Sequence, residues 1–231
     1  MIRLPERAAL LLDLDGTLID LAPTPDAVTV PPELPPTLRA LCRKLGGAVA
    51  IVTGRPVAAV EALLPDTVTA IAGEHGGTIR FAPGESLHRV TLPDLPEQWI
   101  SAAEQAVARH PGTLFERKPR GFALHYRRFP AAGPALETAA RAIVAGTDTH
   151  RVLAGSMVWE VKPRGADKGT AVAALMARAP FAGRVPVFVG DDITDLDGIA
   201  AAQAMGGLGL TVQDAFGDAA GVRAWLAALA G

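Results

Sequence analysis

The chain has 231 residues, with 22 Lys and Arg against 24 Asp and Glu, and a formal net charge of −2. This near-neutral balance argues against a nucleic-acid partner, because proteins of that class carry a strongly basic surface. Hydrophobic residues make up 49% of the chain and charged residues 20%, which indicates a compact globular protein and excludes a disordered one.

The cysteine content and the lengths of the apolar runs indicate the cellular compartment of the protein. The single cysteine, Cys42, excludes an internal disulfide and a zinc cluster and is typical of a reducing compartment. Residues 1–7 carry mixed charges, unlike a signal peptide. No apolar run approaches the roughly 18 to 20 residues of a transmembrane helix. We therefore expect a cytoplasmic protein with no membrane partner.

A run of leucines at residues 10–12 leads directly into Asp-Leu-Asp-Gly-Thr at residues 13–17. The apolar run predicts a buried parallel strand, and the polar residues predict a loop at its carboxyl end, where open α/β sheets bind ligands. Asp13 and Asp15 are two residues apart and so share one face, where burial of both charges requires a cation or hydrogen bonds. Such hard oxygen ligands favour Mg²⁺.

The segments that follow predict a proline-rich loop over 21–36, a helix over 37–46 and a second apolar strand over 48–52. A strand, a helix and a strand form one right-handed βαβ unit with parallel strands. Asp13 and Thr53, which follow the two strands, are therefore expected at the same edge of the sheet. Next come a predicted helix over 57–64, a strand over 67–72 and a hairpin strand over 78–81.

The pattern changes between about residues 94 and 162. The predicted elements are a helix over 96–110, strands over 113–118 and 122–128, a helix over 134–145, and strands over 151–153 and 157–162. This order indicates an α+β module with an antiparallel sheet, unlike the alternation of strands and helices around it. We expect a cap domain at 94–162, inserted into a Rossmann-like α/β core formed by 1–93 and 163–231.

The core pattern resumes after the insertion. Asp167-Lys168-Gly169 opens a predicted helix that runs to residue 179, and residues 185–190 predict a buried strand. Three acids, Asp191, Asp192 and Asp195, follow this strand in a predicted loop. A further strand is predicted over 208–212 and a closing helix over 222–229.

Four polar clusters thus lie at the ends of apolar strands or at the start of a helix. Together they fit phosphoryl transfer, which needs a positioned nucleophile, a proton shuttle, a cation and donors for the phosphate oxygens. Each cluster has a plainer reading when taken alone. Residues 53–55 could be an ordinary turn, 167–169 an ordinary helix start, and 191–195 a capped helix end.

Residues 13–17 resemble the D-x-D-G-T signature of the haloacid dehalogenase superfamily of phosphotransferases. Further motifs look like those of the trehalose-6-phosphate phosphatase family: Gly-Glu-His-Gly at 73–76, Phe-Glu-Arg-Lys at 115–118, Ala-Leu-His-Tyr-Arg at 123–127, Glu-Val-Lys-Pro-Arg-Gly at 160–165 and Gly-Asp-Asp-Ile-Thr-Asp at 190–195. The resemblance implies a haloacid dehalogenase-like core with an inserted cap. It also implies Mg²⁺-dependent hydrolysis of trehalose 6-phosphate through an aspartyl-phosphate.

The resemblance assigns roles in the core. Asp13 would be the nucleophile, and Asp15 would donate and accept protons. Thr53 and Lys168 would bind phosphate oxygens, and Arg55 would contact the substrate. The Mg²⁺ ligands would be Asp13, the backbone carbonyl of Asp15 and Asp191, with Asp192 and Asp195 in support.

In the cap, the resemblance implies sugar contacts from Glu116, Lys118, Arg127 and Glu160. One departure weakens the match, because Leu196 stands where the family pattern has an acid. Two alternatives therefore stay open. The chain could be a capped phosphatase for sucrose phosphate, a mannosyl-phosphoglycerate or a hexose phosphate, or a weakly active sugar-phosphate-binding module that regulates a partner synthase. The expected partners are a small sugar phosphate and, functionally, a trehalose-phosphate synthase.

Overall fold

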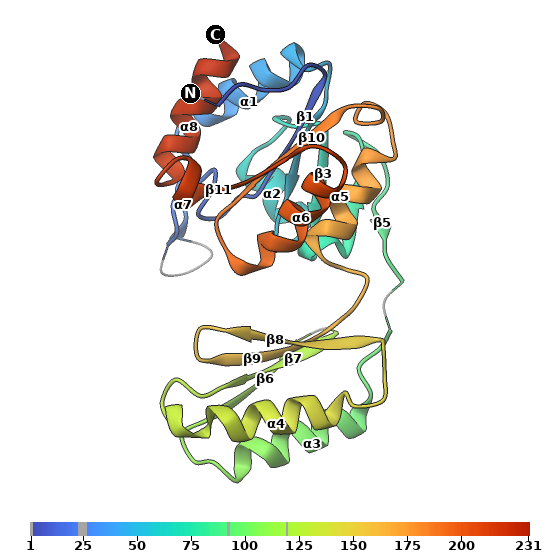
Figure 1. The fold of residues 1–231 in the computed structure, drawn as a ribbon, viewed down its shortest axis with the longest axis vertical. Helices are drawn as coiled ribbons and strands as arrows, with labels where there is room; N and C mark the ends of the chain where they lie inside the picture. Colours follow the sequence, from blue (N-terminus) through green and yellow to red (C-terminus); the bar gives the residue numbers. More distant parts are fainter. Residues whose placement is uncertain (1, 23–26, 92, 119) are drawn as a thin grey trace. The chain divides into compact units, whose positions relative to one another are not determined.

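The computed structural model describes residues 2–22, 27–91, 93–118 and 120–231. Its contacts divide the chain into two units, each with its own hydrophobic core (Figure 1). The core unit comprises the described residues up to Val90 together with Ala166–Gly231. The inserted unit comprises the described residues of Thr91–Gly165.

The core unit is built on a sheet that contains, among the described residues, seven strands in the order β11-β10-β1-β2-β3-β4-β5. These are β1 (Ala8–Leu12), β2 (Val49–Val52), β3 (Ala70–Gly73), β4 (Thr78–Arg80), β5 (His88–Arg89), β10 (Val185–Gly190) and β11 (Leu208–Thr211). Pairing is parallel from β11 through β3 and antiparallel from β3 to β5. The predicted α/β fold with a parallel sheet is confirmed.

Strand β1 lies inside this sheet, between β10 and β2, and all five of its residues are apolar and buried. Leu12 is paired with Val189 of β10 on one side and with Ile51 of β2 on the other. Burial of one such leucine side chain stabilises the fold by about 1.5–3 kcal/mol. The polar residue that follows, Asp13, therefore emerges between two neighbouring strand ends.

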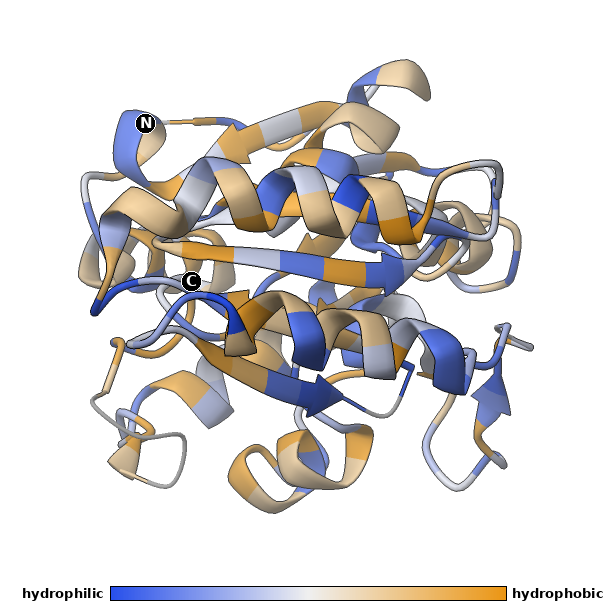
Figure 2. Cartoon of the chain, turned by 90° about the horizontal axis from the view of Figure 1, so that it is seen from below, coloured by the Kyte–Doolittle hydropathy of each residue, from blue (hydrophilic) through white to orange (hydrophobic). Residues whose placement is uncertain are grey.

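Helices cover both faces of the core sheet. The β1 side chains of Ala8, Leu10 and Leu12 pack with residues of α1 (Leu34–Lys44), α2 (Val57–Leu63) and α8 (Ala219–Ala230). Those of Ala9 and Leu11 pack with α5 (Lys168–Met176) and α6 (Leu196–Ala204). This alternation follows from the two-residue period of a strand. In Figure 2 the helices carry both hydrophilic and hydrophobic segments, as expected of elements with one face in a core.

The inserted unit contains an antiparallel sheet of order β6-β7-β9-β8, backed by α3 (Glu97–Ala108) and α4 (Gly133–Ile143). Its strands are β6 (Leu114–Lys118), β7 (Gly121–His125), β8 (His150–Gly155) and β9 (Val158–Pro163). Phe122, Leu124 and Val161 pack against the helices. Glu116, Ala123 and Glu160 lie opposite one another on three adjacent strands and share the other face. The predicted order of helices and strands is confirmed.

Several boundaries differ from those predicted. Helix α1 begins at Leu34, three residues early, because Pro35 and Pro36 lie in its first turn, where no backbone donor is needed. Strand β3 begins at Ala70, since the hydroxyl of Thr67 instead bonds the Leu64 carbonyl at 2.9 Å. Helix α6 was not predicted. Residues 23–26 of the predicted loop lie outside the described residues.

No helix in the described ranges has the length and apolar character needed to cross a bilayer.

Candidate active site

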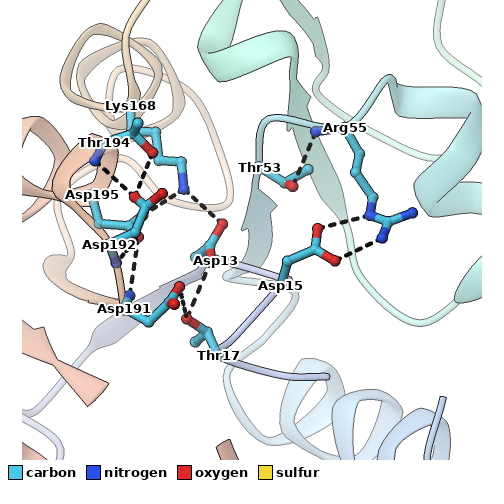
Figure 3. A network of polar contacts seen from close by, with 10 residues as sticks. All are labelled: Asp13, Asp15, Thr17, Thr53, Arg55, Lys168, Asp191, Asp192, Thr194 and Asp195. Carbon is cyan, nitrogen blue, oxygen red and sulfur yellow. Dashed lines mark hydrogen bonds and ion pairs between the residues drawn. The ribbon is translucent and has the colours of Figure 1, made fainter. Parts of the chain in front are cut away.

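The candidate site lies where three parallel strands of the core unit end. Asp13 follows β1, Thr53 follows β2 and Asp191 follows β10, while Lys168 is the first residue of α5. The carboxyl ends of parallel strands meet at one edge, which is why residues so far apart in sequence come together. Figure 3 shows the ammonium of Lys168 directed toward the carboxylate of Asp13.

Lys168 joins two carboxylates at the centre of the site. Its Nζ lies 2.7 Å from Oδ1 of Asp13 and 2.6 Å from Oδ1 of Asp195. Only 3% of Asp13, 3% of Lys168 and none of Asp195 is exposed, so none of the three charges is well hydrated. Burial alone would lower the pKa of Lys168, but the two carboxylates outweigh it and raise that pKa above its ordinary value. Lys168 therefore stays a cation in the site.

Asp195 also fixes the loop that carries Asp191. Its Oδ2 accepts hydrogen bonds from the backbone N–H groups of Asp191 and Asp192, both at 3.0 Å. Burial raises the pKa of Asp195 to about 7, and the negative charge of Asp13 adds to the rise. A Cβ atom at Gly190 would lie 2.2 Å from Cγ of Asp195, so the strand must end in glycine for the carboxylate to fit.

Asp192 has a different task. Its Oδ1 accepts hydrogen bonds from the backbone N–H and the hydroxyl of Thr194, both at 2.7 Å, and so caps the short 3₁₀ turn Ile193–Asp195. Burial would raise the pKa of Asp192, but the bonds from Thr194 and the charge of Lys168 outweigh it and lower that pKa. Leu196, where the family pattern has an acid, begins α6 with half of its surface exposed.

Three carboxylates form a cluster that can hold a metal ion. Oxygen atoms of Asp13, Asp191 and Asp195 lie within 4.8 Å of one another. Burial raises the pKa of Asp13 to about 7 and raises that of Asp191, with repulsion from Asp195 adding to the latter. Burial thus makes the charged carboxylates costly, and Lys168 compensates only part of that cost. A divalent cation bound by oxygen ligands would compensate the rest.

Residues 16 and 17 pack closely around this cluster. Gly16 has φ +76°, and a Cβ atom there would lie 2.1 Å from Oδ2 of Asp191. The hydroxyl of Thr17 lies 3.3 Å from Oδ2 of Asp13 and 3.4 Å from Oδ1 of Asp191, so it can donate to either. Sequence reasoning gave Thr17 no role, although it belongs to the signature at 13–17 that located the site.

Asp15 points away from the cluster and pairs with Arg55. The Arg55 Nε lies 2.7 Å from Oδ2 of Asp15, and Nη2 lies 2.7 Å from Oδ1. The side chains are 15% and 29% exposed for arginine and aspartate, so the pair borders solvent. Thr53 is buried, and its hydroxyl oxygen accepts the backbone N–H of Arg55 at 3.2 Å. The residue expected to contact substrate thus holds the expected acid and base.

In the inserted unit, each of the expected sugar-contact residues makes a polar contact within the unit. Lys118 Nζ lies 2.7 Å from Oε1 of Glu160. Glu116 Oε2 lies 2.7 Å from Nε2 of His125, a residue to which sequence reasoning gave no definite role although it lies in the motif at 123–127. Arg127 lies beyond β7, and its Nη2 bonds the carbonyl and hydroxyl of Ser156 at 3.2 and 3.3 Å.

The sequence of the chain matches a known protein family. Residues 11–214 match the family described as trehalose-phosphatase. The trehalose-6-phosphate phosphatase of Escherichia coli (strain K12) is 40% identical over 210 residues, which cover 90% of this chain and 79% of that protein.

Solved structures show the same fold. The trehalose-6-phosphate phosphatase of Aspergillus fumigatus aligns with a TM-score of 0.74 at 24% identity, over 97% of this chain and 93% of that one. A haloacid dehalogenase-like hydrolase from Bacteroides thetaiotaomicron aligns with a TM-score of 0.63 at 13% identity, over 96% and 99%. The fold is therefore haloacid dehalogenase-like, and the chain belongs to the trehalose-phosphatase family.

Proposed function

We propose that this protein hydrolyses trehalose 6-phosphate to trehalose and inorganic phosphate. The observation that carries the proposal is the buried contact of Lys168 with Asp13 and Asp195, beside Asp191, in a chain of this family. The relative from Escherichia coli bears the name of that activity. An enzyme of the cytoplasm, coupled to a trehalose-phosphate synthase that supplies the substrate, fits this proposal.

The metal is proposed to be Mg²⁺. The family resemblance implies a divalent metal, and the cluster of Asp13, Asp191 and Asp195, of which Asp13 and Asp195 are buried, fits one. Asp13, Asp191 and the backbone carbonyl of Asp15 would hold the ion, with Asp195 beside them. When bound, Mg²⁺ would draw negative charge from the phosphate oxygens and so ease attack on phosphorus.

In the first step the carboxylate of Asp13 attacks phosphorus. A bond forms between an Asp13 oxygen and phosphorus, while the bond between phosphorus and the sugar oxygen breaks. Asp15 donates a proton to that leaving oxygen, which releases trehalose. The ammonium of Lys168 and the hydroxyl of Thr53 hold the phosphate oxygens in place.

In the second step a water molecule attacks phosphorus in the aspartyl-phosphate. Asp15, now deprotonated, takes a proton from this water. The bond between phosphorus and the Asp13 oxygen breaks, which frees inorganic phosphate and restores the carboxylate of Asp13. Arg55 holds both oxygens of Asp15 and so directs this side chain.

Selectivity for the sugar is proposed to reside in a cap formed by residues 94–162, with 1–93 and 163–231 as the catalytic core. Glu116, Lys118, Arg127 and Glu160 would hydrogen-bond the sugar hydroxyls, as the family resemblance implies. The charged groups of Glu116, Lys118 and Glu160 share one face of the inserted sheet, which supports this assignment.

The test is phosphate release by the purified chain. Trehalose 6-phosphate, sucrose phosphate, a mannosyl-phosphoglycerate and glucose 6-phosphate are compared, each with Mg²⁺ and with excess chelator. We expect kcat/KM for trehalose 6-phosphate to exceed the others by more than about a hundredfold, and the chelator to abolish turnover. A preference for another ester would reassign the substrate. Binding without release from any ester would instead support a regulatory sugar-phosphate-binding module.

A further inference from the structure

A turn of the core unit, Gly73–Gly77, lies between two parts of the site that the proposed mechanism uses together. It connects β3 to β4 and comprises the 3₁₀ segment Glu74–Gly76 with a glycine on either side. We call it the 73–77 turn. On one side it contacts the loop 53–55, which carries the phosphate-binding hydroxyl of Thr53. On the other it contacts the start of α5, which carries Lys168.

Backbone hydrogen bonds tie the turn to the loop 53–55. The N–H of Glu74 donates to the carbonyl of Arg55 at 3.0 Å, and the N–H of His75 donates to the carbonyl of Thr53 at 2.9 Å. These bonds reach the residues on both sides of Gly54. The path of the loop 53–55 is therefore fixed from the turn.

The ring of His75 fills the space beside Gly54. A Cβ atom at Gly54 would lie 2.7 Å from Nε2 and 2.8 Å from Cε1 of this ring, closer than real carbon atoms approach. The contact explains why the position between Thr53 and Arg55 is glycine. Because the ring is in contact with the backbone, its size sets how near the loop can come to the turn.

The opposite side of the turn meets the helix that begins with Lys168. A Cβ atom at Gly76 would lie 2.7 Å from the carbonyl oxygen of Asp167 and 3.0 Å from Cβ of Ala171. Asp167 is the capping residue of α5, since its side chain accepts the N–H of Thr170 at 2.8 Å. The turn therefore packs directly against the residue that precedes Lys168.

The turn has an unusual backbone that its neighbours hold in place. Glu74 has φ +53° and His75 has φ +56°, a left-handed conformation that is uncommon for residues with side chains, although histidine is enriched there. The carboxylate of Glu74 accepts a hydrogen bond from the buried hydroxyl of Thr78. Such conformations persist where the surrounding contacts fix them, and they are concentrated at functional sites.

We propose that the 73–77 turn sets the spacing between the loop 53–55 and Lys168, with His75 as the positioning residue through its contact with Gly54. The inference rests on the proposed function for one point only, the binding of phosphate oxygens by Thr53 and Lys168. A ring that fixes the Thr53 hydroxyl relative to the ammonium should affect every phosphate ester alike, because the sugar plays no part in this contact.

The experiment compares His75→Asn, Gly54→Ala and the double variant with the wild type. Asparagine tolerates the left-handed backbone but lacks the ring, so this variant removes the contact and leaves the turn able to form. We measure kcat and KM for trehalose 6-phosphate and for para-nitrophenyl phosphate, product inhibition by inorganic phosphate, and thermal unfolding. His88→Asn, an exposed histidine on β5, is the matched control and should behave as wild type.

We expect each single variant to lose at least tenfold in kcat on both esters and to weaken inhibition by phosphate. The midpoint of unfolding should fall by less than about 4 °C, a minor change for a domain of this size. The double variant should be at least fivefold more active than Gly54→Ala, because the missing ring makes room for the new methyl group. Non-additivity of this kind is the signature of residues in contact.

Three results would overturn the inference. These are wild-type kcat and phosphate inhibition in His75→Asn, a double variant less than fivefold more active than Gly54→Ala, or a loss confined to thermal stability. Calorimetric binding of inorganic phosphate gives the same comparison without an ester. Failure of the wild type on trehalose 6-phosphate would thus count against the proposed function alone.

Discussion

The guanidinium of Arg55 holds both carboxylate oxygens of Asp15, with Nε and Nη2 each 2.7 Å from one of them. Two parallel hydrogen bonds fix the plane of the carboxylate as well as its distance, which a single ammonium group cannot do. Asp15 is the proposed proton donor and acceptor. Its direction is therefore set by a residue forty positions further along the chain.

Arg55→Lys is expected to lower kcat by about ten- to a hundredfold and to leave the fold intact, because a point charge replaces a two-point contact. Turnover of trehalose 6-phosphate and thermal unfolding are measured together. Arg141→Lys is the matched control, since Arg141 bonds Glu137 on the exposed face of α4. Unchanged kcat in Arg55→Lys would show that turnover does not depend on the two-point contact between Arg55 and Asp15.

Asp13→Asn should abolish turnover and preserve the fold. The amide oxygen of asparagine can still accept a hydrogen bond from Lys168, so the buried contact at 2.7 Å survives in weaker form. What is lost is the proposed nucleophile, together with one proposed oxygen ligand for the metal. Phosphate release measures the turnover, and circular dichroism shows whether the fold is preserved. Appreciable turnover in the purified variant would rule out a covalent step on Asp13.

Asp195→Asn and Asp192→Asn should differ sharply. Asp195 uses one oxygen for Lys168 and the other for two backbone N–H groups, and an amide offers only one oxygen. Its replacement should cost about 1–3 kcal/mol of unfolding free energy and most of the activity. Asp192 uses a single oxygen for Thr194, which asparagine can supply.

Chemical unfolding and kcat provide the measurement for both aspartate variants. Equal losses would contradict the different roles that the contacts give to Asp192 and Asp195.

Glu116→Gln and Glu160→Gln should lose activity selectively. Hydrogen bonds to charged groups contribute roughly 1.5–3 kcal/mol, so kcat/KM for trehalose 6-phosphate should fall about ten- to a hundredfold. Para-nitrophenyl phosphate has no sugar hydroxyls, and its hydrolysis should change less than about twofold. Glu97→Gln is the control, because Glu97 forms an exposed ion pair with Arg117. Parallel losses on both esters would make the two residues structural.

His150 predicts a pH dependence of stability. The residue is 2% exposed, its Nδ1 lies 3.0 Å from the Thr149 hydroxyl, and its ring meets Trp99 edge to face at 4.9 Å. Burial lowers the pKa of His150 below its ordinary value of 6.5. Below that value the unfolded chain binds a proton that the folded chain does not, so folding stability falls as the pH drops.

The loss from this one group is at most about 1.4 kcal/mol per pH unit. His150→Phe cannot titrate, so its unfolding free energy should fall less than that of the wild type between pH 7.5 and pH 5.5. Chemical unfolding at the two pH values measures the difference. A fall identical to that of the wild type would mean that His150 does not contribute.

The sequence predicts most of the fold because the apolar runs have clear periods. The apolar residues that form β1 and the polar residues that follow them predict a buried parallel strand and its loop. Helix α6 escaped notice because its buried residues, Gly198, Ile199 and Ala202, include two small ones and form no strong apolar stripe. The start of α1 was missed because prolines usually signal a loop.

The candidate site was only partly predictable. Spacing and resemblance drew attention to Asp13, Lys168 and Asp195, since each stands at the end of a strand or near the start of a helix. Pairings across the site were not predictable, because the contact between Arg55 and Asp15 depends on how two loops fold over the sheet edge. No local pattern in the sequence encodes such a contact.

The pairing of β1 with β10 bears on how the chain folds during synthesis. Ala8 pairs with Val185, so the centre of the core sheet closes only after most of the chain has left the ribosome. The inserted unit is one continuous stretch whose strands pair only with one another, so it can fold earlier. In a nascent chain that stops before residue 185, the inserted unit could therefore be folded while the core sheet is still incomplete. The candidate active site would form last, because Asp191 and Asp195 follow β10.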